Sequence, residues 1–276
     1  MTQGLAPVDR PLLAVDGDSF AHRAYHALPK SIRFNAVIGF SNMIVRLWEQ
    51  ERPRAVLVGW DSYEEPTYRH LAFPAYQSGR QFDASLLEQL AMLPRLCDAL
   101  GFATAKGAGY EADDFLAAAV LAEEARGGTC LVATGDRDAY QLASDRTTIL
   151  FPTRGVSELT RIGPAEVRQR YGVEPAQVPD FIALRGDPSD KLPGARGVGP
   201  KTAAEVLRRF GSLEAAIEAG RFAGQADDLR LYRRIAAMDP HAPVPEVPDR
   251  MPDWAAGAAL VREWGVTQLA DRLAAK

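Results

Sequence analysis

The acidic residues of this sequence gather in short groups whose spacing suggests a metal site. Glu111, Asp113 and Asp114 fall in the first turn expected of a helix that continues through the apolar residues 115–121. Many helices begin with acidic residues that have no chemical role. Such residues are stabilised by the helix dipole by about 0.3–1 kcal/mol. This cluster therefore indicates chemistry only in combination with the other acids of the chain.

Further acids directly follow short apolar runs. These runs have the length of buried parallel strands and occupy residues 11–15, 55–60 and 130–134. They are followed by Asp16, by Asp61 and by the pair Asp136 and Asp138. Because the carboxyl ends of parallel strands form the ligand-binding edge of an α/β sheet, we expect these side chains to lie together.

A second predicted helix ends at another acidic pair, Asp187 and Asp190. Two carboxylates about 4 Å apart repel each other by roughly 4 kcal/mol at an effective dielectric of 20, so a pocket of many carboxylates requires cations. Oxygen ligands without histidine or cysteine select Mg²⁺ or Mn²⁺ over zinc. Two such ions about 3.5–4 Å apart activate a water and stabilise the leaving oxygen in phosphodiester hydrolysis.

Length and composition indicate one substantial core with a smaller attached module. The chain has 276 residues, and 47% of them are hydrophobic. Cys97 and Cys130 form no CxxC motif, which argues against a zinc site or a disulfide framework. We found no run of about 18 apolar residues that could span a membrane, and we expect a cytoplasmic protein. A net charge of −4 taken alone argues against a nucleic-acid partner.

Apolar strands alternate with segments of helical period, which predicts an α/β core. A fourth strand is expected at residues 149–151, and residues 19–28 are expected to be helical or looped. Helices are expected at residues 36–48, 86–100, 163–171, 201–210 and 226–238, and between residue 253 and the last residue.

Two segments have the composition of a nucleic-acid surface. Residues 62–82 mix aromatic and basic side chains, which suits either a mobile segment holding a strand or an ordinary surface loop. Between residues 185 and 209, six Lys and Arg residues accompany three acids, two of which are the proposed metal ligands Asp187 and Asp190. A glycine turn at 197–199 before Lys201 and Thr202 would let backbone N–H groups approach phosphate.

The motifs closely resemble, in order, those of the 5′ nuclease family. This family includes the 5′–3′ exonuclease domain of bacterial DNA polymerase I and the flap endonucleases. The resemblance runs from about residue 11 to 217 and rests on Val15-Asp16-Gly17, Trp60-Asp61, the segments 73–80 and 109–114, Thr134-Gly135-Asp136-Arg137-Asp138, and the segment 186–203.

The resemblance implies an α/β, PIN-like, mostly parallel sheet flanked by helices. Residues 1–160 would form the nuclease core, with a helical arch at 62–84 through or under which the 5′ strand passes. Residues 161–222 would form a DNA-binding module with a helix-hairpin-helix-like motif at 181–210, which in relatives also binds a monovalent cation such as K⁺. Residues 223–276 would be C-terminal helices completing the domain.

The resemblance also implies the activity. A monomer would cut DNA at flaps, nicks or gaps by a two-metal mechanism with Mg²⁺ or Mn²⁺, leaving a 5′-phosphate. The first ion would lie near Asp16, Asp61, Glu111 and Asp113, with Asp114 in an outer shell, and the second near Asp136, Asp138, Asp187 and Asp190. The expected DNA-binding residues are His22, Tyr76, Gln77, Arg196, Gly197, Gly199, Lys201 and Thr202.

Two positions depart from the family pattern. Gln77 stands where bacterial relatives usually carry a lysine beside the scissile phosphate, so we expect slower cleavage or compensation by Arg69, Arg80 or Arg23. His22 stands where relatives often carry tyrosine, and it either stacks on a base or merely packs.

Three alternatives remain open on the sequence. A catalytically weak, structure-specific DNA-binding protein would be consistent with Gln77. A haloacid dehalogenase-like phosphatase would account for Asp16-Gly17-Asp18 but not for the acids at 111–114. A PIN-type ribonuclease would lack the module at 181–210.

Overall fold

The computed structural model describes residues 10–154 and 158–276 and contains one six-stranded sheet. Its strands stand in the order β3-β2-β1-β4-β5-β6. Their bounds are β1 Leu12–Asp16, β2 Ala55–Gly59, β3 Ala103–Ala105, β4 Cys130–Ala133, β5 Thr147–Arg154 and β6 Glu158–Ile162. All neighbours pair in parallel except β5 and β6, which are antiparallel. The predicted mostly parallel α/β sheet is thereby confirmed.

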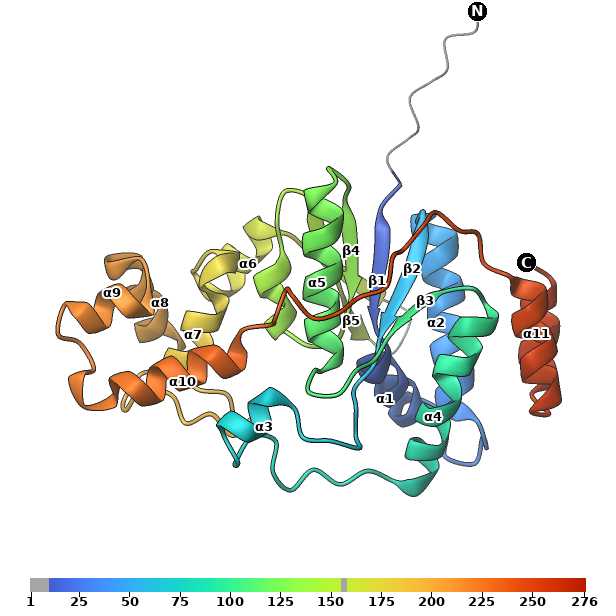
Figure 1. The fold of residues 1–276 in the computed structure, drawn as a ribbon, viewed down its shortest axis with the longest axis horizontal. Coiled ribbons are helices and arrows are strands. Elements are labelled where there is room, and N and C mark those ends of the chain that lie inside the picture. The colour runs from blue at the N-terminus through green and yellow to red at the C-terminus, as the bar shows by residue number, and fades with distance from the viewer. Residues whose placement is uncertain (1–9, 155–157) are drawn as a thin grey trace, which may run out of the picture.

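Alternate residues of the central strands pack on opposite faces of the sheet. On β1, Leu12 and Ala14 contact the cluster that contains helix α5 (Ala112–Ala125), whereas Leu13 and Val15 belong to the cluster on the other face. That second face is covered by α1 (Gly17–Ala27), α2 (Asn35–Glu51) and α4 (Ala84–Ala99), as Figure 1 shows. Because both faces are covered, the central strands β1, β2 and β4 are predominantly apolar, as the sequence predicted.

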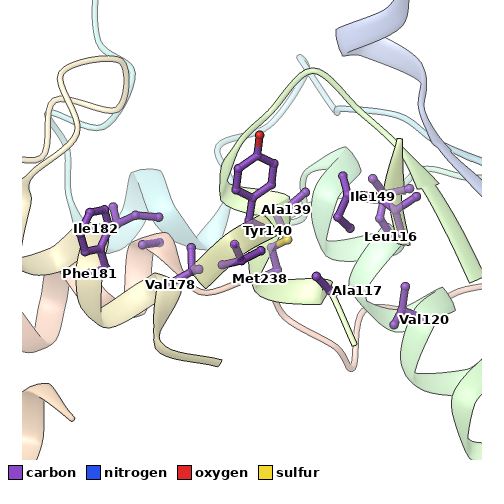
Figure 2. Packing of buried hydrophobic residues seen from close by; sticks show 14 of the residues in the cluster. Leu116, Ala117, Val120, Ala139, Tyr140, Ile149, Val178, Phe181, Ile182 and Met238 are labelled. Carbon is purple, nitrogen blue, oxygen red and sulfur yellow. The ribbon is translucent and has the colours of Figure 1, made fainter. Parts of the chain in front are cut away.

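The α5 side of the core continues into a group of helices beside the sheet. This helical module comprises α6 (Pro164–Tyr171), α7 (Val178–Arg185), α8 (Pro200–Phe210), α9 (Leu213–Glu218) and α10 (Ala226–Ala236). Figure 1 shows these helices together at one end of the sheet. Figure 2 shows how Val178, Phe181 and Ile182 of α7 and Met238 extend the cluster that contains Leu116 of α5. The module is therefore held to the sheet by a continuous apolar core.

The arch segment, residues 62–84, has little regular secondary structure. Before α4 begins at Ala84, only α3 (Tyr68–Ala72) is helical within it. Pro66 and Pro74 flank this helix, and Gln77 and Gly79 have positive φ angles of 48° and 82°. These residues restrict helix formation to a single short turn, so the arch is far less helical than the resemblance implied.

Residues 237–253 lead from α10 back along the sheet to α11 (Trp254–Glu263) and α12 (Thr267–Ala274), as Figure 1 shows. The buried Arg54 anchors this connection by donating to the Val247 carbonyl (2.6 Å) and to Asp249 (3.0 Å). Val261 and Leu273 then pack into the core on the α4 face. In the described part of the chain, no helix combines the length and hydrophobicity that a membrane crossing requires.

Candidate active site

A cavity of about 830 Å³ opens where β1, β2 and β4 end. Carboxylates from five separate segments line it: Asp16, Asp18, Asp61, Glu111, Asp113, Asp136, Asp138 and Asp187. The structure thus brings together seven of the nine predicted acids, which lie as far apart as residues 16 and 187 in the sequence. Asp114 and Asp190 stand outside the cavity wall, and Asp18 is an additional acid.

Asp16 joins the end of β1 to the start of α1. Its carboxylate caps the helix by accepting from the Ser19 amide (2.9 Å), and it also accepts from the Thr134 hydroxyl (2.7 Å) at the end of β4. The side chain is buried, with 6% of its surface exposed. Cap and strand therefore fix the position of this carboxylate.

Glu111 and Asp61 meet at the start of α5. Asp61 accepts from the Ala112 amide (2.7 Å), and Glu111 accepts from the hydroxyls of Thr67 (3.0 Å) and Tyr76 (2.9 Å). Both hydroxyls belong to the arch. The Glu111 carboxylate therefore links the arch to the edge of the sheet. The Asp61 carboxylate lies at the N-terminus of α5, where the helix dipole stabilises its negative charge.

Asp114 is completely buried and lies in a bidentate ion pair with Arg69. The two guanidinium nitrogens are 2.7 Å from the two carboxylate oxygens, and Arg69 exposes only 1% of its side chain. Arg69 is also 3.5 Å from Glu111 and 3.6 Å from Asp113. The prediction that Arg69 could compensate beside a phosphate is wrong, because the guanidinium is enclosed and fully engaged by these acids.

Asp136 and Asp138 follow β4 in a tight turn. The Asp136 amide donates to the Thr134 hydroxyl (3.0 Å), and the Asp138 amide donates to the Asp136 carboxylate (2.9 Å). Asp138 then begins the short helix η1 (Asp138–Leu142). The sequence Thr-Gly-Asp-Arg-Asp therefore turns both acids back toward the cavity that Asp16 also lines.

Asp187 and Asp190 belong to the loop after α7. Gly186 has a φ of 81°, and the backbones of Asp187 and Leu192 pair in both directions at 2.9 and 2.8 Å. Asp187 also accepts from the Ser189 amide (2.8 Å) and from Arg185 (3.0 Å). Asp190 instead reaches the arch, accepting from Gln77 (3.1 Å) and lying 3.4 Å from Arg80.

Burial, followed by mutual repulsion, raises the pKa values of several of these acids. Burial raises the pKa of Asp16 to about 7 and that of Asp18 to about 6. Burial, followed by the charges of Asp18 and Glu111, raises the pKa of Asp61 well above its usual value. Burial and neighbouring carboxylates likewise raise the pKa values of Asp113 and Asp138. The cluster therefore favours bound cations or protons.

The donor set fits hard divalent cations. It consists of carboxylates, and one Asp113 oxygen is buried without a hydrogen-bond partner. Within residues 10–154 and 158–276, no three histidine, cysteine, aspartate or glutamate side chains are grouped closely enough to form a ready-made site. An open ring of carboxylates suits Mg²⁺, which retains several waters and uses few direct protein ligands.

The arch residues predicted to bind DNA have different surroundings. Gln77 and Arg80 line the cavity, and Arg80 is 44% exposed. Tyr76 is only 3% exposed and donates to Glu111, so its predicted DNA contact is wrong: the ring is packed into the core. His22 lines the cavity edge-on to Phe82 (5.1 Å between centroids), and burial lowers its pKa. Arg23 is half-buried on α1 and is not part of the described cavity wall.

The predicted glycine turn is exposed at the start of α8. Gly197 has a φ of 73°, and a side chain there would meet no atom within 4 Å. Gly199 caps α8, and Pro200 occupies its first turn. Arg196, Lys201 and Thr202 are all exposed on the same turn. These backbone groups are therefore accessible to a ligand.

Several residues of the cavity were not predicted from the sequence, among them Asp18, Tyr63 and Arg185. Asp18 is 5% exposed and accepts from the Asp61 amide (2.7 Å) and from the Tyr63 hydroxyl (2.6 Å). Arg185 lines the same cavity. The acid after Asp16-Gly17 was a visible signal for Asp18, but no sequence pattern gives the direction of Tyr63 or Arg185.

Two family models match the chain over adjoining ranges. The N-terminal resolvase-like domain of 5′-3′ exonucleases matches residues 11–172, and the C-terminal SAM fold of 5′-3′ exonucleases matches residues 173–253. The chain therefore belongs to the 5′-3′ exonuclease family. The two models meet within the helical module, between α6 and α7.

Individual relatives agree with this assignment. The DNA polymerase I proteins of Mycobacterium tuberculosis and Bacillus subtilis are 41% and 37% identical over 215 residues, or 75% and 76% of this chain. The chain spans about a quarter of their length, since the matches cover 24% of each relative.

Solved structures share the fold at low sequence identity. T5 5′-exonuclease with bound zinc is 18% identical with a TM-score of 0.71, and the match covers 96% of this chain and 98% of that one. The catalytic core of Rad2 in complex with DNA substrate is 14% identical with a TM-score of 0.61, covering 96% and 92%.

Proposed function

We propose that this protein is a structure-specific 5′ nuclease that hydrolyses DNA phosphodiesters at flaps, nicks or gaps with the help of divalent cations. One observation carries the proposal: in the fold of the 5′-3′ exonuclease family, eight carboxylates line one cavity at the sheet edge. The first products would carry a 5′-phosphate. The T5 flap endonuclease, whose structure has been determined with DNA and metal ions, shares this fold with a TM-score of 0.70.

The carboxylates divide into two groups that would hold two Mg²⁺ or Mn²⁺ ions. Asp16, Asp61, Glu111 and Asp113 would form the first group. The second group would comprise Asp136, Asp138 and Asp187, with Asp190 behind them. When bound, the ions would lower the pKa of an attacking water and neutralise charge on the leaving oxygen.

The remaining side chains would orient the cluster and the substrate. Thr134 and Ser19 hold Asp16 in place, and Arg69 fixes Asp114 in the first turn of α5. Arg80 is an exposed cation of the cavity wall and would contact the phosphate, and His22 would contact the neighbouring nucleotide. Gln77 would offer a neutral hydrogen-bond donor where a cation stabilises developing charge better.

The helical module would bind the duplex beside the cleavage point. Its exposed turn at 197–199 and α8 start would bind backbone phosphate through N–H groups and Lys201. We also propose that K⁺ binds at this turn and that the protein acts as a monomer. Its three parts would be the core at residues 1–160, the DNA-binding module at residues 161–222 and the C-terminal helices at residues 223–276.

The test is cleavage of a 5′-flap duplex labelled at both ends, with and without Mg²⁺. We expect wild-type protein to cut near the junction only with the ion, and Asp136→Asn to lose at least about 100-fold in rate. Product lengths distinguish stepwise removal from a single cut. A metal-independent rate, or full activity of the variant, would contradict the proposal.

One observation favours a second candidate, a catalytically weak DNA-binding protein. Gln77 brings no positive charge to the cavity wall, and its amide is already hydrogen-bonded to Tyr76 and Asp190. Binding of the flap duplex without cleavage in either Mg²⁺ or Mn²⁺ would favour this candidate.

A further inference from the structure

Helix α1 presents one row of side chains to the two ends of the arch. Asp18, His22 and Tyr25 are spaced i, i+4 and i+7 along this helix, so they lie on one face of it. We call these three residues the α1 row. The arch begins with an entry limb, residues 62–66, and ends with a return limb, residues 80–83. Each member of the α1 row contacts one of these two limbs.

Tyr63 attaches the entry limb to the α1 row. Its hydroxyl donates to one oxygen of Asp18 at 2.6 Å, and the other oxygen of Asp18 accepts from the Asp61 amide at 2.7 Å. Asp18 is buried, and hydrogen bonds to a carboxylate are about twice as strong as those between neutral groups. Asp18 therefore holds the chain at two positions where β2 continues into the arch.

Phe82 attaches the return limb. Its ring lies edge-on to His22 at 5.1 Å and edge-on to Tyr63 at 5.4 Å between centroids. The next residue, Asp83, accepts from the Tyr25 hydroxyl at 3.0 Å. Because Phe82 contacts both the α1 row and Tyr63, the two limbs are joined to each other as well as to the helix.

Helix α1 is closely packed on both of its neighbours and so gives these contacts a fixed support. Gly17 lies so near the Trp60 indole that a side chain there would be 2.6 Å from the ring. A side chain at Gly39 of α2 would likewise be 2.6 Å from Ala24 of α1. Such close packing resists a shift of the helix, so the limbs are held against a rigid element.

Arg80 lies at the start of the return limb, two residues before Phe82. Its side chain lines the acidic cavity together with His22, Tyr63 and Phe82. Its own ion pair is weak, since it lies 3.4 Å from Asp190 and is 44% exposed. The position of Arg80 therefore depends on the ring contacts that hold the return limb.

We propose that Tyr63 is a positioning residue of the arch. By joining Asp18 to Phe82, it holds the return limb against α1 and keeps Arg80 at the cavity wall before substrate binds. A cation fixed in advance stabilises the reacting phosphate without the cost of ordering the arch during the reaction. The role of Arg80 at the phosphate rests on the proposed nuclease function, whereas the attachment of the arch to α1 does not.

The test compares Tyr63→Leu and Tyr63→Phe with Tyr110→Phe as a matched control. Tyr63→Leu removes both contacts, whereas Tyr63→Phe keeps the ring against Phe82 and loses only the hydrogen bond. Tyr63 is 43% exposed, so both variants should fold, and thermal melting checks this. Tyr110 also lies beside the arch, edge-on to Tyr68 at 6.5 Å, but it is not part of the described cavity wall.

The first measurement is hydrogen–deuterium exchange of the arch, followed by mass spectrometry of peptides from residues 74–83. It is made on the protein without DNA, so it does not depend on any nuclease activity. We expect Tyr63→Leu to speed exchange in the return limb by at least about fivefold, because the limb then opens more often. Tyr63→Phe should have a smaller effect, and Tyr110→Phe should match wild type.

The second measurement is single-turnover cleavage of a 5′-flap duplex at saturating protein. We expect Tyr63→Leu to lower the rate by about tenfold and Tyr63→Phe by about threefold, because the cation is no longer held in place. Affinity for the duplex, measured by anisotropy in an Asp136→Asn background, should stay unchanged. In an Arg80→Gln background, Tyr63→Leu should lower the rate no further, since the group that it positions is gone.

Unchanged exchange of the return limb in Tyr63→Leu would overturn the inference and leave the nuclease proposal intact. A tenfold loss of rate that Tyr63→Leu adds equally in the Arg80→Gln background would also overturn it, because Tyr63 would then act independently of Arg80. If wild-type protein never cleaved, the nuclease proposal would fail, while faster exchange in Tyr63→Leu would still support the attachment of the arch to α1.

Discussion

Gln77 links the arch to the loop that carries Asp190. Its amide donates to the Tyr76 hydroxyl at 2.7 Å and to Asp190 at 3.1 Å. The side chain therefore stabilises an arch position beside the cavity, but it carries no charge. A cation there would stabilise the negative charge that develops on the phosphate in the transition state. A neutral amide stabilises this charge only weakly.

Gln77→Lys should therefore raise the single-turnover cleavage rate, by about tenfold. Gln77→Met is the matched control, because it keeps a long side chain at the same strained φ of 48° without charge or hydrogen bond. Equal rates for the lysine and methionine variants would show that charge at this position does not matter.

Arg69 contributes to the stability of the fold through its ion pair with Asp114. It exposes 1% of its side chain and is the bidentate partner of the fully buried Asp114. Removing one partner of such a pair leaves a buried charge alone, at a cost of about 3–5 kcal/mol. Arg69→Met should lower the free energy of unfolding by this amount in urea denaturation.

Two variants check that explanation. Arg80→Met removes an arginine that is 44% exposed, and it should cost less than about 1 kcal/mol. Arg69→Met/Asp114→Asn removes both charges and should recover part of the loss. If the double variant were less stable than Arg69→Met, the unpaired carboxylate would not be the cause.

Among the elements, the loop from Gly186 to Gly194 has the tightest backbone packing near the site. Gly194 has a φ of 74°, and a side chain there would lie 2.5 Å from the Gly186 nitrogen. Gly197 has nearly the same φ, 73°, but open space around it. Comparing substitutions at these two glycines therefore distinguishes the cost of a steric clash from the cost of backbone strain.

Gly194→Ala should be clearly more destabilising than Gly197→Ala, for which strain alone costs about 1 kcal/mol. Because the loop carries Asp187 and Asp190, Gly194→Ala should also weaken metal binding. Thermal melting with and without Mn²⁺ measures both effects. Equal melting temperatures for the two alanine variants would contradict a tightly packed loop.

Some elements and site residues could be predicted from the sequence, and others could not. Asp16 and Asp61 were predictable because an apolar run that stops at an acid marks the carboxyl end of a buried strand. The three-residue β3 and the edge strand β6 were not predicted, since short or half-polar strands have little periodicity. Arg69 was misassigned because its partner Asp114 is 45 residues away, and no local pattern reveals that pairing.

Across the whole molecule, the acids couple folding to protons and cations. The folded-state pKa of Asp16 is about 7, above its ordinary 3.8. Below pH 3.8 this carboxyl is protonated in both states and has no effect. As the pH rises from about 4 to about 7, the unfolded chain ionises first, so metal-free stability falls, by about 1.4 kcal/mol per unit of pKa difference.

Without divalent ions, Asp16→Asn should therefore gain stability relative to wild type as the pH rises from 4 to 7. With saturating Mg²⁺ at pH 7.5 the order should reverse, because only the wild-type site is stabilised by the bound ion. Thermal melting in matched buffers measures both differences. A constant difference between the two proteins across this pH range would contradict the raised pKa.

The central claim is that distant acids meet around a pair of divalent cations. Calorimetric titration with Mn²⁺, followed by electron paramagnetic resonance of the saturated protein, tests it most directly. We predict two bound ions per chain with the spectral signature of a coupled pair, and loss of the coupling in Asp136→Asn. No Mn²⁺ binding, or isolated uncoupled ions that Asp136→Asn leaves unchanged, would contradict the claim.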